Sequence, residues 1–267
     1  PKHLETAQRH IARCREIRSR ISKGIDFMQQ SDKALLAFKI ANRAMALQHG
    51  WKSEEGSRSF ELEWRPFQLA FILLAMESVC NRDSTDRDTL DLLWFPTGGG
   101  KTEAYLALIA IGSIYRRFTE SKEAKFGNFA IMRYTLRLLT LQQFERASGL
   151  ILALELIRKN IVDSKIDIEG LGDVPFSIGL WVGDDATKNK FDDAEAVRGQ
   201  QDAATAEQIR DCYICKSSLE WIYNKNTLEI RPTCTSNVCI LGKKFGPWPV
   251  LTVDEDIYNT VPTVIIG

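Results

Sequence analysis

The sequence predicts an α/β protein whose parallel sheet carries helices on both faces. Apolar, strand-like runs at 89–95, 128–134 and 175–182 alternate with helical patterns that begin near residues 103 and 137. Parallel strands need long crossover connections, usually helices, so this alternation favours a parallel sheet over an antiparallel one. Ligands of such sheets bind beyond the carboxyl ends of the strands.

The composition excludes some classes of protein. Hydrophobic residues make up 44% and charged residues 26% of the 267 residues, as in ordinary globular proteins. The 35 basic and 35 acidic residues balance, which argues against a tail-driven nucleic-acid binder but allows a local binding groove. No apolar run reaches the roughly 18 residues of a membrane span, and the basic first twenty residues lack a signal-peptide pattern. We therefore expect a cytoplasmic protein with no membrane partner.

A helical N-terminal extension is predicted for residues 1–60. Between Lys2 and Lys23 there are seven Lys/Arg residues and two Glu, and Ser31 is placed to cap a second helix. The basic segment could contact DNA, remain solvated or pack on another part of the protein, and we favour packing. A further helix is expected from Pro66 to about residue 80, because proline suits a first helical turn.

The stretch LWFPTGGGKTEAYLALIAI, residues 93–111, joins a predicted strand to a predicted buried helix. Consecutive glycines let backbone N–H groups turn inward towards a phosphate, and the start of the helix adds partial positive charge. Lys101 would reach the outer phosphates and the Thr102 hydroxyl would bind Mg²⁺. Phe95 departs from the strict pattern, and a glycine-rich turn with a chance Gly-Lys-Thr is the alternative. The candidate triphosphate-binding residues are Thr97, Gly98, Gly99, Gly100, Lys101 and Thr102.

Three segments resemble superfamily 2 helicases. Pro-Thr-Gly-x-Gly-Lys-Thr resembles their nucleotide loop, and Arg65-Pro66-Phe67-Gln68 resembles their adenine-sensing segment. The resemblance implies that Gln68 reads the adenine of ATP, although a surface glutamine at a helix start is the alternative. The segment 134–142 resembles the one in which an arginine and a later glutamine contact or support nucleic acid. That comparison implies nucleic-acid-binding roles for Arg137 and Gln142, with an ordinary amphipathic helix as the alternative.

Taken together, the strings at 93–108, 132–147 and 176–187, followed by four cysteines, resemble the helicase subunits of the DISARM bacterial anti-phage system. The resemblance implies a RecA-like P-loop NTPase that uses ATP and Mg²⁺, engages DNA and works with partner subunits of a defence complex. Members of that family are much longer, so we expect an incomplete motor domain.

The cysteine pattern predicts a zinc site. Cys212-x-x-Cys215 is followed, after eighteen residues, by Cys234 and Cys239, which four residues separate. Two thiolates from each pair close a tetrahedral Zn²⁺ site, and the apolar runs between the pairs predict a hairpin around 224–227, as in zinc ribbons. Four independent buried cysteines are the alternative.

Asp254-Glu255 follows an apolar run and is a weak candidate for the acidic pair that holds Mg²⁺ in ATP hydrolysis. The expected organisation is a helical extension at 1–60, the first part of a motor domain at 61–205, a zinc-ribbon-like insert at 206–245 and a return to the motor domain at 246–267.

The predicted function is the ATP-binding portion of a DNA helicase or translocase in anti-phage defence, with negligible hydrolysis by this chain alone. One alternative is a zinc-ribbon module on a non-hydrolysing nucleotide fold that binds a protein or DNA. Another is a P-loop enzyme acting on a small molecule, which the segment from Arg137 to Gln142 and the predicted zinc ribbon disfavour.

Overall fold

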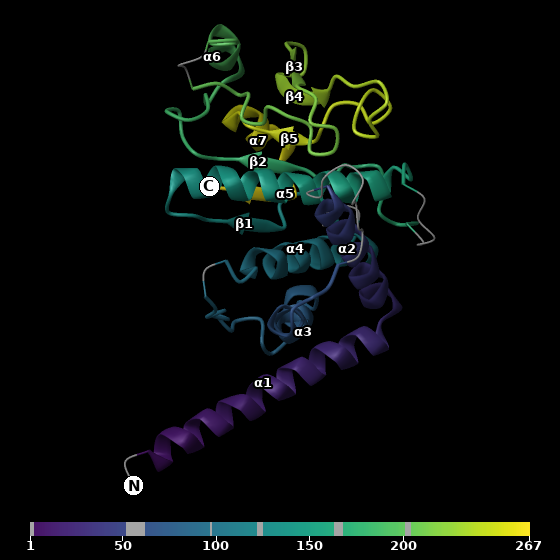
Figure 1. Ribbon diagram of the computed structural model, residues 1–267. Helices are drawn as coiled ribbons and strands as arrows, with labels where there is room; N and C mark the ends of the chain where they lie inside the picture. Colours follow the sequence, from purple (N-terminus) through teal and green to yellow (C-terminus); the bar gives the residue numbers. More distant parts are fainter. Residues whose placement is uncertain (1–2, 52–61, 97, 122–124, 163–167, 201–203) are drawn as a thin grey trace.

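The computed structural model describes residues 3–51, 62–96, 98–121, 125–162, 168–200 and 204–267, without the side chain of Arg137. A four-stranded sheet and a hairpin of two strands are joined by helices (Figure 1). The helices are α1 (Leu4–Gln30), α2 (Asp32–Gly50), α3 (Pro66–Cys80), α4 (Lys101–Thr119), α5 (Arg137–Arg158), α6 (Phe191–Ala196) and α7 (Asp254–Thr260). The sheet strands are β1 (Ala130–Met132), β2 (Ile178–Leu180), β5 (Val250–Leu251) and β6 (Val264–Ile266), and the hairpin strands are β3 (Leu219–Asn224) and β4 (Glu229–Cys234).

The sheet is parallel, as the sequence predicts. Its strand order is β1-β6-β2-β5, and every neighbouring pair runs in the same direction. Val264 at the start of β6 lies opposite Ala130 of β1 and Ile178 of β2. β6 is the last of these strands in sequence and lies between two earlier ones, so strands more than eighty residues apart depend on each other for their hydrogen bonds.

One predicted strand is absent from the sheet. Residues 89–95 form neither a helix nor a strand, and their side chains at 90, 92 and 94 are exposed. The prediction of a strand at 89–95 is therefore wrong for this structure. The apolar composition is that of a strand, but strand formation needs a partner edge, and no described strand lies against this segment.

Within the described residues 3–51, the predicted N-terminal helices are present as α1 and α2. The Ser31 hydroxyl accepts a hydrogen bond from the Ala34 N–H (3.2 Å) and begins α2, whose buried alanines allow close packing on α4 and α5. α1 packs along α3, and at Gly24 a Cβ atom would lie only 1.9 Å from the Leu73 carbonyl oxygen, so a glycine is required there. The N-terminal half of α1 extends away from the body (Figure 1).

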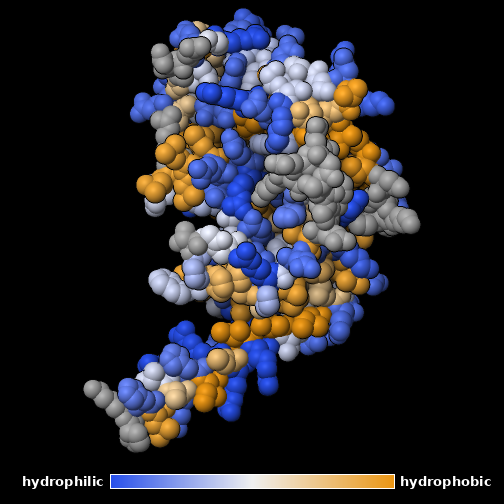
Figure 2. Space-filling model, in the orientation of Figure 1, coloured by the Kyte–Doolittle hydropathy of each residue, from blue (hydrophilic) through white to orange (hydrophobic). Residues whose placement is uncertain are grey.

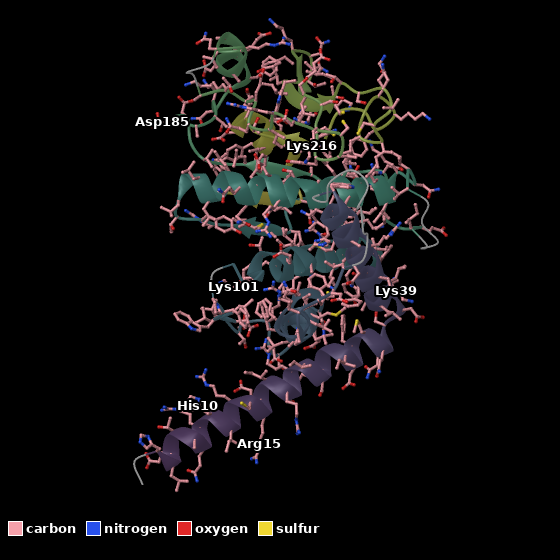
Figure 3. The ribbon with its side chains drawn as sticks, in the orientation of Figure 1. His10, Arg15, Lys39, Lys101, Asp185 and Lys216 are labelled. Atoms are coloured by element: carbon pink, nitrogen blue, oxygen red, sulfur yellow. The ribbon has the colours of Figure 1, made fainter. Side chains whose placement is uncertain are left out.

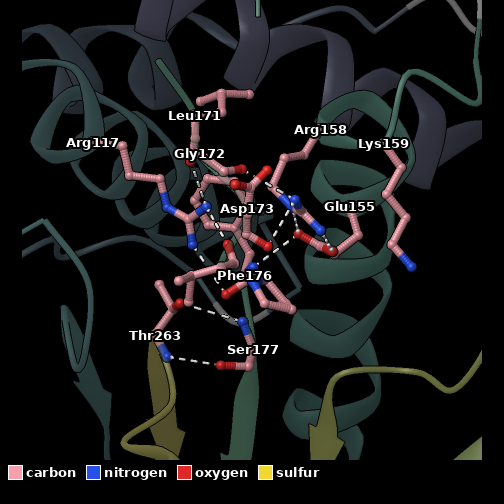
Figure 4. A network of polar contacts seen from close by, with 12 residues as sticks. Arg117, Glu155, Arg158, Lys159, Leu171, Gly172, Asp173, Phe176, Ser177 and Thr263 are labelled. Carbon is pink, nitrogen blue, oxygen red and sulfur yellow. Dashed lines mark hydrogen bonds and ion pairs between the residues drawn. The ribbon is translucent and has the colours of Figure 1, made fainter. Parts of the chain in front are cut away.

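A buried arginine ties α4 to the segment that leads into β2 (Figure 4). The Arg117 guanidinium donates to the carbonyls of Leu171, Val174 and Pro175 at 2.7–3.0 Å and stacks on the Phe176 ring. Burial lowers the pKa of Arg117 to about 9, which still leaves it charged at neutral pH. The three carbonyls compensate for part of the lost hydration, so the contact fixes the entry into β2.

Glu155 of α5 extends this network from the other side. Its carboxylate accepts from the Phe176 N–H (2.8 Å) and from the Arg158 guanidinium (2.7 and 2.8 Å) (Figure 4). α4 and α5 therefore both form hydrogen bonds to the residues just before β2.

Among the described residues, no helix is both long and apolar enough to cross a membrane.

Candidate nucleotide loop and metal centre

The glycine loop, residues 95–100, turns directly into α4. Gly98 and Gly100 have φ angles of +77° and +88°, which side chains with a Cβ rarely adopt, and the Gly99 N–H donates to the Pro96 carbonyl (3.2 Å). Gly100 is the N-cap residue of α4, and no side chain caps this helix start. The first amides of α4 therefore keep their partial positive charge for a ligand. Thr97, a predicted site residue, lies outside the described residues.

Lys101 folds back over the glycine loop. Its ammonium donates to the carbonyl oxygens of Phe95 (2.6 Å) and Pro96 (3.3 Å). Figure 3 shows Lys101 and Asp185 on the same side of the molecule, and Asp185 follows the carboxyl end of β2. The loop and the carboxyl ends of the strands therefore share one side, as expected for a ligand site in a parallel sheet. Thr102, next along α4, is partly buried.

The start of α3 holds the glycine loop in place. Buried Gln68 donates through Nε2 to the Gly100 carbonyl (2.7 Å), and its Oε1 accepts from the Arg65 N–H (2.9 Å). The Arg65 guanidinium donates to the Gly99 carbonyl (2.9 Å), and the Phe67 ring stacks on Phe95 with centroids 3.8 Å apart. The backbone of this chain therefore engages both ends of the Gln68 amide in this structure. The prediction that Gln68 reads adenine stays a prediction.

An ion pair missed by the sequence reasoning links α4 to α5 beside the loop. Glu103, in the first turn of α4, accepts through Oε1 from the Arg146 guanidinium, while its Oε2 is buried without a described partner. The Gln48 side chain of α2 donates to the Arg146 carbonyl. No local pattern in the sequence signals such a pair, because its members are 43 residues apart. The ion pair connects α4, which follows the glycine loop, to α5, which carries Gln142.

The predicted nucleic-acid residues lie on α5. Gln142 is exposed, and the side chain of Arg137 lies outside the described residues. The structure therefore places both positions at the N-terminal end of one helix, which begins just after β1. It does not test their contacts with DNA.

The acidic run at the start of α7 is engaged within the protein. Glu255 Oε2 accepts from the Phe191 N–H (3.0 Å), and Asp256 accepts a bidentate pair of hydrogen bonds from Arg231 of β4. Burial raises the pKa of Asp254 above its usual value, although a hydrogen bond from Trp181 opposes this. Glu255 and Asp256 thus join α7 to the start of α6 and to the hairpin, which disfavours Asp254-Glu255 as a free pair of Mg²⁺ ligands.

The four predicted zinc ligands come together. Cys212 and Cys215 precede the hairpin, Cys234 ends β4 and Cys239 follows it, and their sulfur atoms all lie within 4.8 Å of one another. The Sγ–Sγ distances are 3.7 Å for Cys212–Cys239 and 3.5 Å for Cys215–Cys234, and all four thiols are free. Tetrahedral sulfur ligands about 2.3 Å from a Zn²⁺ ion lie about 3.8 Å apart. This donor set fits zinc.

The environment of the sulfurs suits a closed metal site. Backbone N–H groups of Ile214 and Cys215 point at the Cys212 sulfur, the arrangement of a metal-binding turn. Burial raises the pKa of Cys212, and it raises that of Cys239 to about 11. Burial also acts to raise the pKa of Cys215, but hydrogen bonds, the strongest from Ser217, outweigh it and lower the value to about 6. A bound cation would favour the thiolate form of all four.

Comparison with known proteins supports the sequence resemblance. No protein-family model matches the chain. DISARM protein DrmA of Bacillus paralicheniformis is 37% identical to this chain over an alignment 294 residues long, which includes 98% of this chain. The chain is similar to DISARM protein DrmA over nearly its whole length. The resemblance to the DISARM system predicted from the sequence is thereby confirmed.

The match covers nearly all of this chain but a small part of the relative. The chain spans 26% of the length of DrmA, about a quarter. The glycine loop and the cysteine cluster, both far from the chain ends, lie within the matched stretch. The similarity therefore concerns the region that carries both candidate sites, and most of DrmA lies outside it.

Proposed function

We propose that this chain is the nucleotide-binding portion of an ATP-dependent DNA helicase or translocase that acts in anti-phage defence. The similarity to DrmA supports the defence role, and the parallel sheet with a glycine loop before α4 supports a RecA-like P-loop fold. In this proposal residues 61–205 and 246–267 form part of the motor domain, residues 206–245 form the zinc-binding insert, and residues 1–60 are a helical extension. Partner subunits of the defence system and DNA are the proposed partners.

The proposal rests mainly on the contacts that the Lys101 ammonium makes. Its ammonium has no carboxylate partner in the described structure and is satisfied by two carbonyls of its own loop. Phosphate oxygens are stronger acceptors for an ammonium than backbone carbonyls, so a triphosphate would displace these contacts. The uncapped start of α4 supplies further donors. In this proposal the Thr102 hydroxyl binds Mg²⁺.

The nucleic-acid role rests on α5. Arg137 and Gln142 lie in the first turns of α5, which follows the carboxyl end of β1. Arginine and glutamine are suited to phosphate and sugar contacts, which position a strand without reading its sequence. The Glu103–Arg146 ion pair joins α5 to α4, the helix that follows the glycine loop. In this proposal it connects nucleic-acid binding at α5 with nucleotide binding at the loop.

The proposed zinc is structural. Four sulfurs fill a tetrahedral Zn²⁺ shell and leave no position for a substrate. The metal would hold the two cysteine pairs together at the base of the hairpin, which contacts α7 through Arg231 and Asp256. Zinc therefore fixes the position of the insert and takes no direct part in chemistry.

The experiment that tests nucleotide binding is titration of this chain with a fluorescent ATP analogue and Mg²⁺. We expect saturable binding that Lys101→Ala weakens by about tenfold or more, because a charge-assisted contact to phosphate is lost. The matched control is Lys33→Ala, which removes an exposed lysine at the start of α2 and should leave the affinity unchanged. Equal binding by wild type and Lys101→Ala would refute the proposed triphosphate site.

A further inference from the structure

A small pocket marks the place where α2, α5 and the cysteine turn, residues 212–215, meet. The pocket encloses about 160 Å³, and Gln48 of α2, Arg146 of α5 and Tyr213 of the cysteine turn line it. Figure 3 labels Lys216, which follows the cysteine turn, above the middle of α5. The cysteine turn therefore lies against α5, beside the arginine whose side chain reaches α4.

Tyr213 is the side chain through which the cysteine turn contacts α5. Its ring stacks on the buried Trp248, with ring centroids 5.6 Å apart and an angle of 28° between the ring planes. The Tyr213 hydroxyl is buried beside the Ser148 hydroxyl of α5. Trp248 comes just before β5, so the tyrosine ring joins α5 to the segment that enters the sheet.

The segment after the second cysteine pair contacts the end of α5. Lys159, the residue after α5, donates through Nζ to the Phe245 carbonyl (2.7 Å), and its ammonium lies 4.3 Å from the centre of the Phe245 ring. Phe245 follows Cys239 along the same segment. A metal ion bound by all four sulfurs would therefore join the contact at Tyr213 to the contact at Phe245.

Arg146 connects this part of α5 to the glycine loop. Gln48 donates to the Arg146 carbonyl, and the Arg146 guanidinium donates to the Glu103 carboxylate in the first turn of α4. That carboxylate lies against the N-cap residue of α4, because a Cβ atom on Gly100 would be 3.3 Å from Glu103 Oε2. Arg146 and Tyr213 line the same pocket, so a shift of α5 at Tyr213 moves Arg146 as well.

We propose that Tyr213 positions α5, and that metal binding to the four cysteines thereby strengthens nucleotide binding at the glycine loop. The bound metal holds Tyr213 and Phe245 in place, α5 keeps Arg146 on Glu103, and Glu103 keeps the first turn of α4 aligned with the loop. Tyr213 acts through α5 and is a positioning residue. The inference rests on the proposed nucleotide site and adds a means of regulating it. Because coupling between two sites is reciprocal, bound nucleotide should also tighten metal binding.

Nucleotide titration of zinc-loaded and zinc-free protein tests the coupling. The probe is a fluorescent ATP analogue with Mg²⁺, added after the chelator that removes zinc has itself been removed. We expect the affinity of the wild type to fall about tenfold without zinc, as is usual for coupled sites. Tyr213→Ala keeps all four sulfurs and should bind zinc, but its nucleotide affinity should no longer depend on zinc. Tyr213→Phe keeps the ring and should behave as the wild type.

A second variant tests the path from α5 to the loop. Arg146→Ala should bind the analogue with one weakened affinity, the same with zinc and without it. The matched control is Arg15→Ala, which removes an exposed arginine of α1, the helix that projects from the body at the lower left of Figure 2. This control should keep the full dependence on zinc. An affinity of the wild type that ignores zinc, or full zinc dependence in Tyr213→Ala or Arg146→Ala, would overturn the proposal.

Hydrogen exchange without nucleotide separates this inference from the nucleotide site. The Tyr105 amide closes the first hydrogen bond of α4, to the Lys101 carbonyl, and should exchange at least about fivefold faster when zinc is removed. The Met76 amide inside α3 is the internal control and should not change. If no form binds the analogue, the proposed nucleotide site is refuted, and the Tyr105 amide still decides the coupling. Unchanged exchange at Tyr105, or an equal change at Met76, would overturn it.

Discussion

At the scale of single residues, Gln68 and Arg65 shape the glycine loop before any ligand arrives. Gln68 holds the Gly100 carbonyl and Arg65 holds the Gly99 carbonyl, so two carbonyls of the loop are turned towards α3. A peptide whose carbonyl points away presents its neighbouring N–H groups to the opposite side. In the proposed phosphate site, α3 therefore acts indirectly, by keeping the loop in one conformation. The structure assigns Gln68 this role, which the sequence resemblance does not specify.

A substitution at Gln68 separates loop support from adenine reading. We expect Gln68→Ala to weaken ATP and GTP binding by the same factor, about tenfold, because one buried hydrogen bond to Gly100 is lost and the loop relaxes. The measurement is competition of each nucleotide against a fluorescent analogue. Gln143→Ala, a buried glutamine of α5, is the matched control. A loss confined to ATP would show instead that the Gln68 amide contacts the base.

At the scale of elements, the β3–β4 hairpin brings four cysteines together in a compact candidate metal centre. The hairpin pairs Leu219 with Cys234 at its base, next to the other three sulfurs. Binding Zn²⁺ to four thiols releases their protons. Because the four sulfurs come together only in the folded insert, the free energy of metal binding adds to the stability of the insert. The cysteine spacing predicted the ligands, and the apolar runs between the two pairs predicted the hairpin.

Removing one sulfur tests the metal centre. Purified, reduced protein should contain about one zinc per chain, and Cys212→Ser should lose the metal and unfold at a lower temperature. Zinc affinity should fall as the pH is lowered from about 8 to 6, since protons compete for the thiolates. Cys14→Ser, an exposed cysteine on α1, is the control and should change neither property. Absence of zinc from wild type, with unchanged melting of Cys212→Ser, would contradict the assignment.

The elements also show how far local sequence determines this fold. Ser31, Pro66 and Gly100 act within a few residues of their own position, and the helices they begin appear as predicted. Strands need partners far away in the chain, and residues 89–95 have none among the described strands. The Glu103–Arg146 and Arg231–Asp256 contacts join residues 43 and 25 positions apart, so no local pattern could reveal them.

At the scale of the whole molecule, a few polar contacts join the glycine loop, the helix proposed to bind nucleic acid (α5) and the cysteine-bearing insert. Glu103–Arg146 links the loop helix to α5, and Arg231–Asp256 links the insert to α7 beside the sheet. The acidic run at the start of α7 does not supply a free acidic pair. In this run, Glu255 accepts a hydrogen bond from the Phe191 N–H, and Asp256 accepts hydrogen bonds from Arg231. ATP hydrolysis needs an acidic group that holds Mg²⁺ and polarises water.

We therefore expect this chain to bind ATP–Mg²⁺ but to hydrolyse it at a rate close to that of buffer alone. Phosphate release should be the same for wild type and Lys101→Ala, with or without DNA, because both lack the group that activates water. Rapid turnover that Lys101→Ala abolishes would contradict this expectation and point to α7. Asp254→Asn would then identify the acid, since the Asp254 Oδ1 atom is buried without a described hydrogen-bond partner and its carboxylate is the least committed of the three. If turnover survived Asp254→Asn, the acidic group would have to lie elsewhere in the chain.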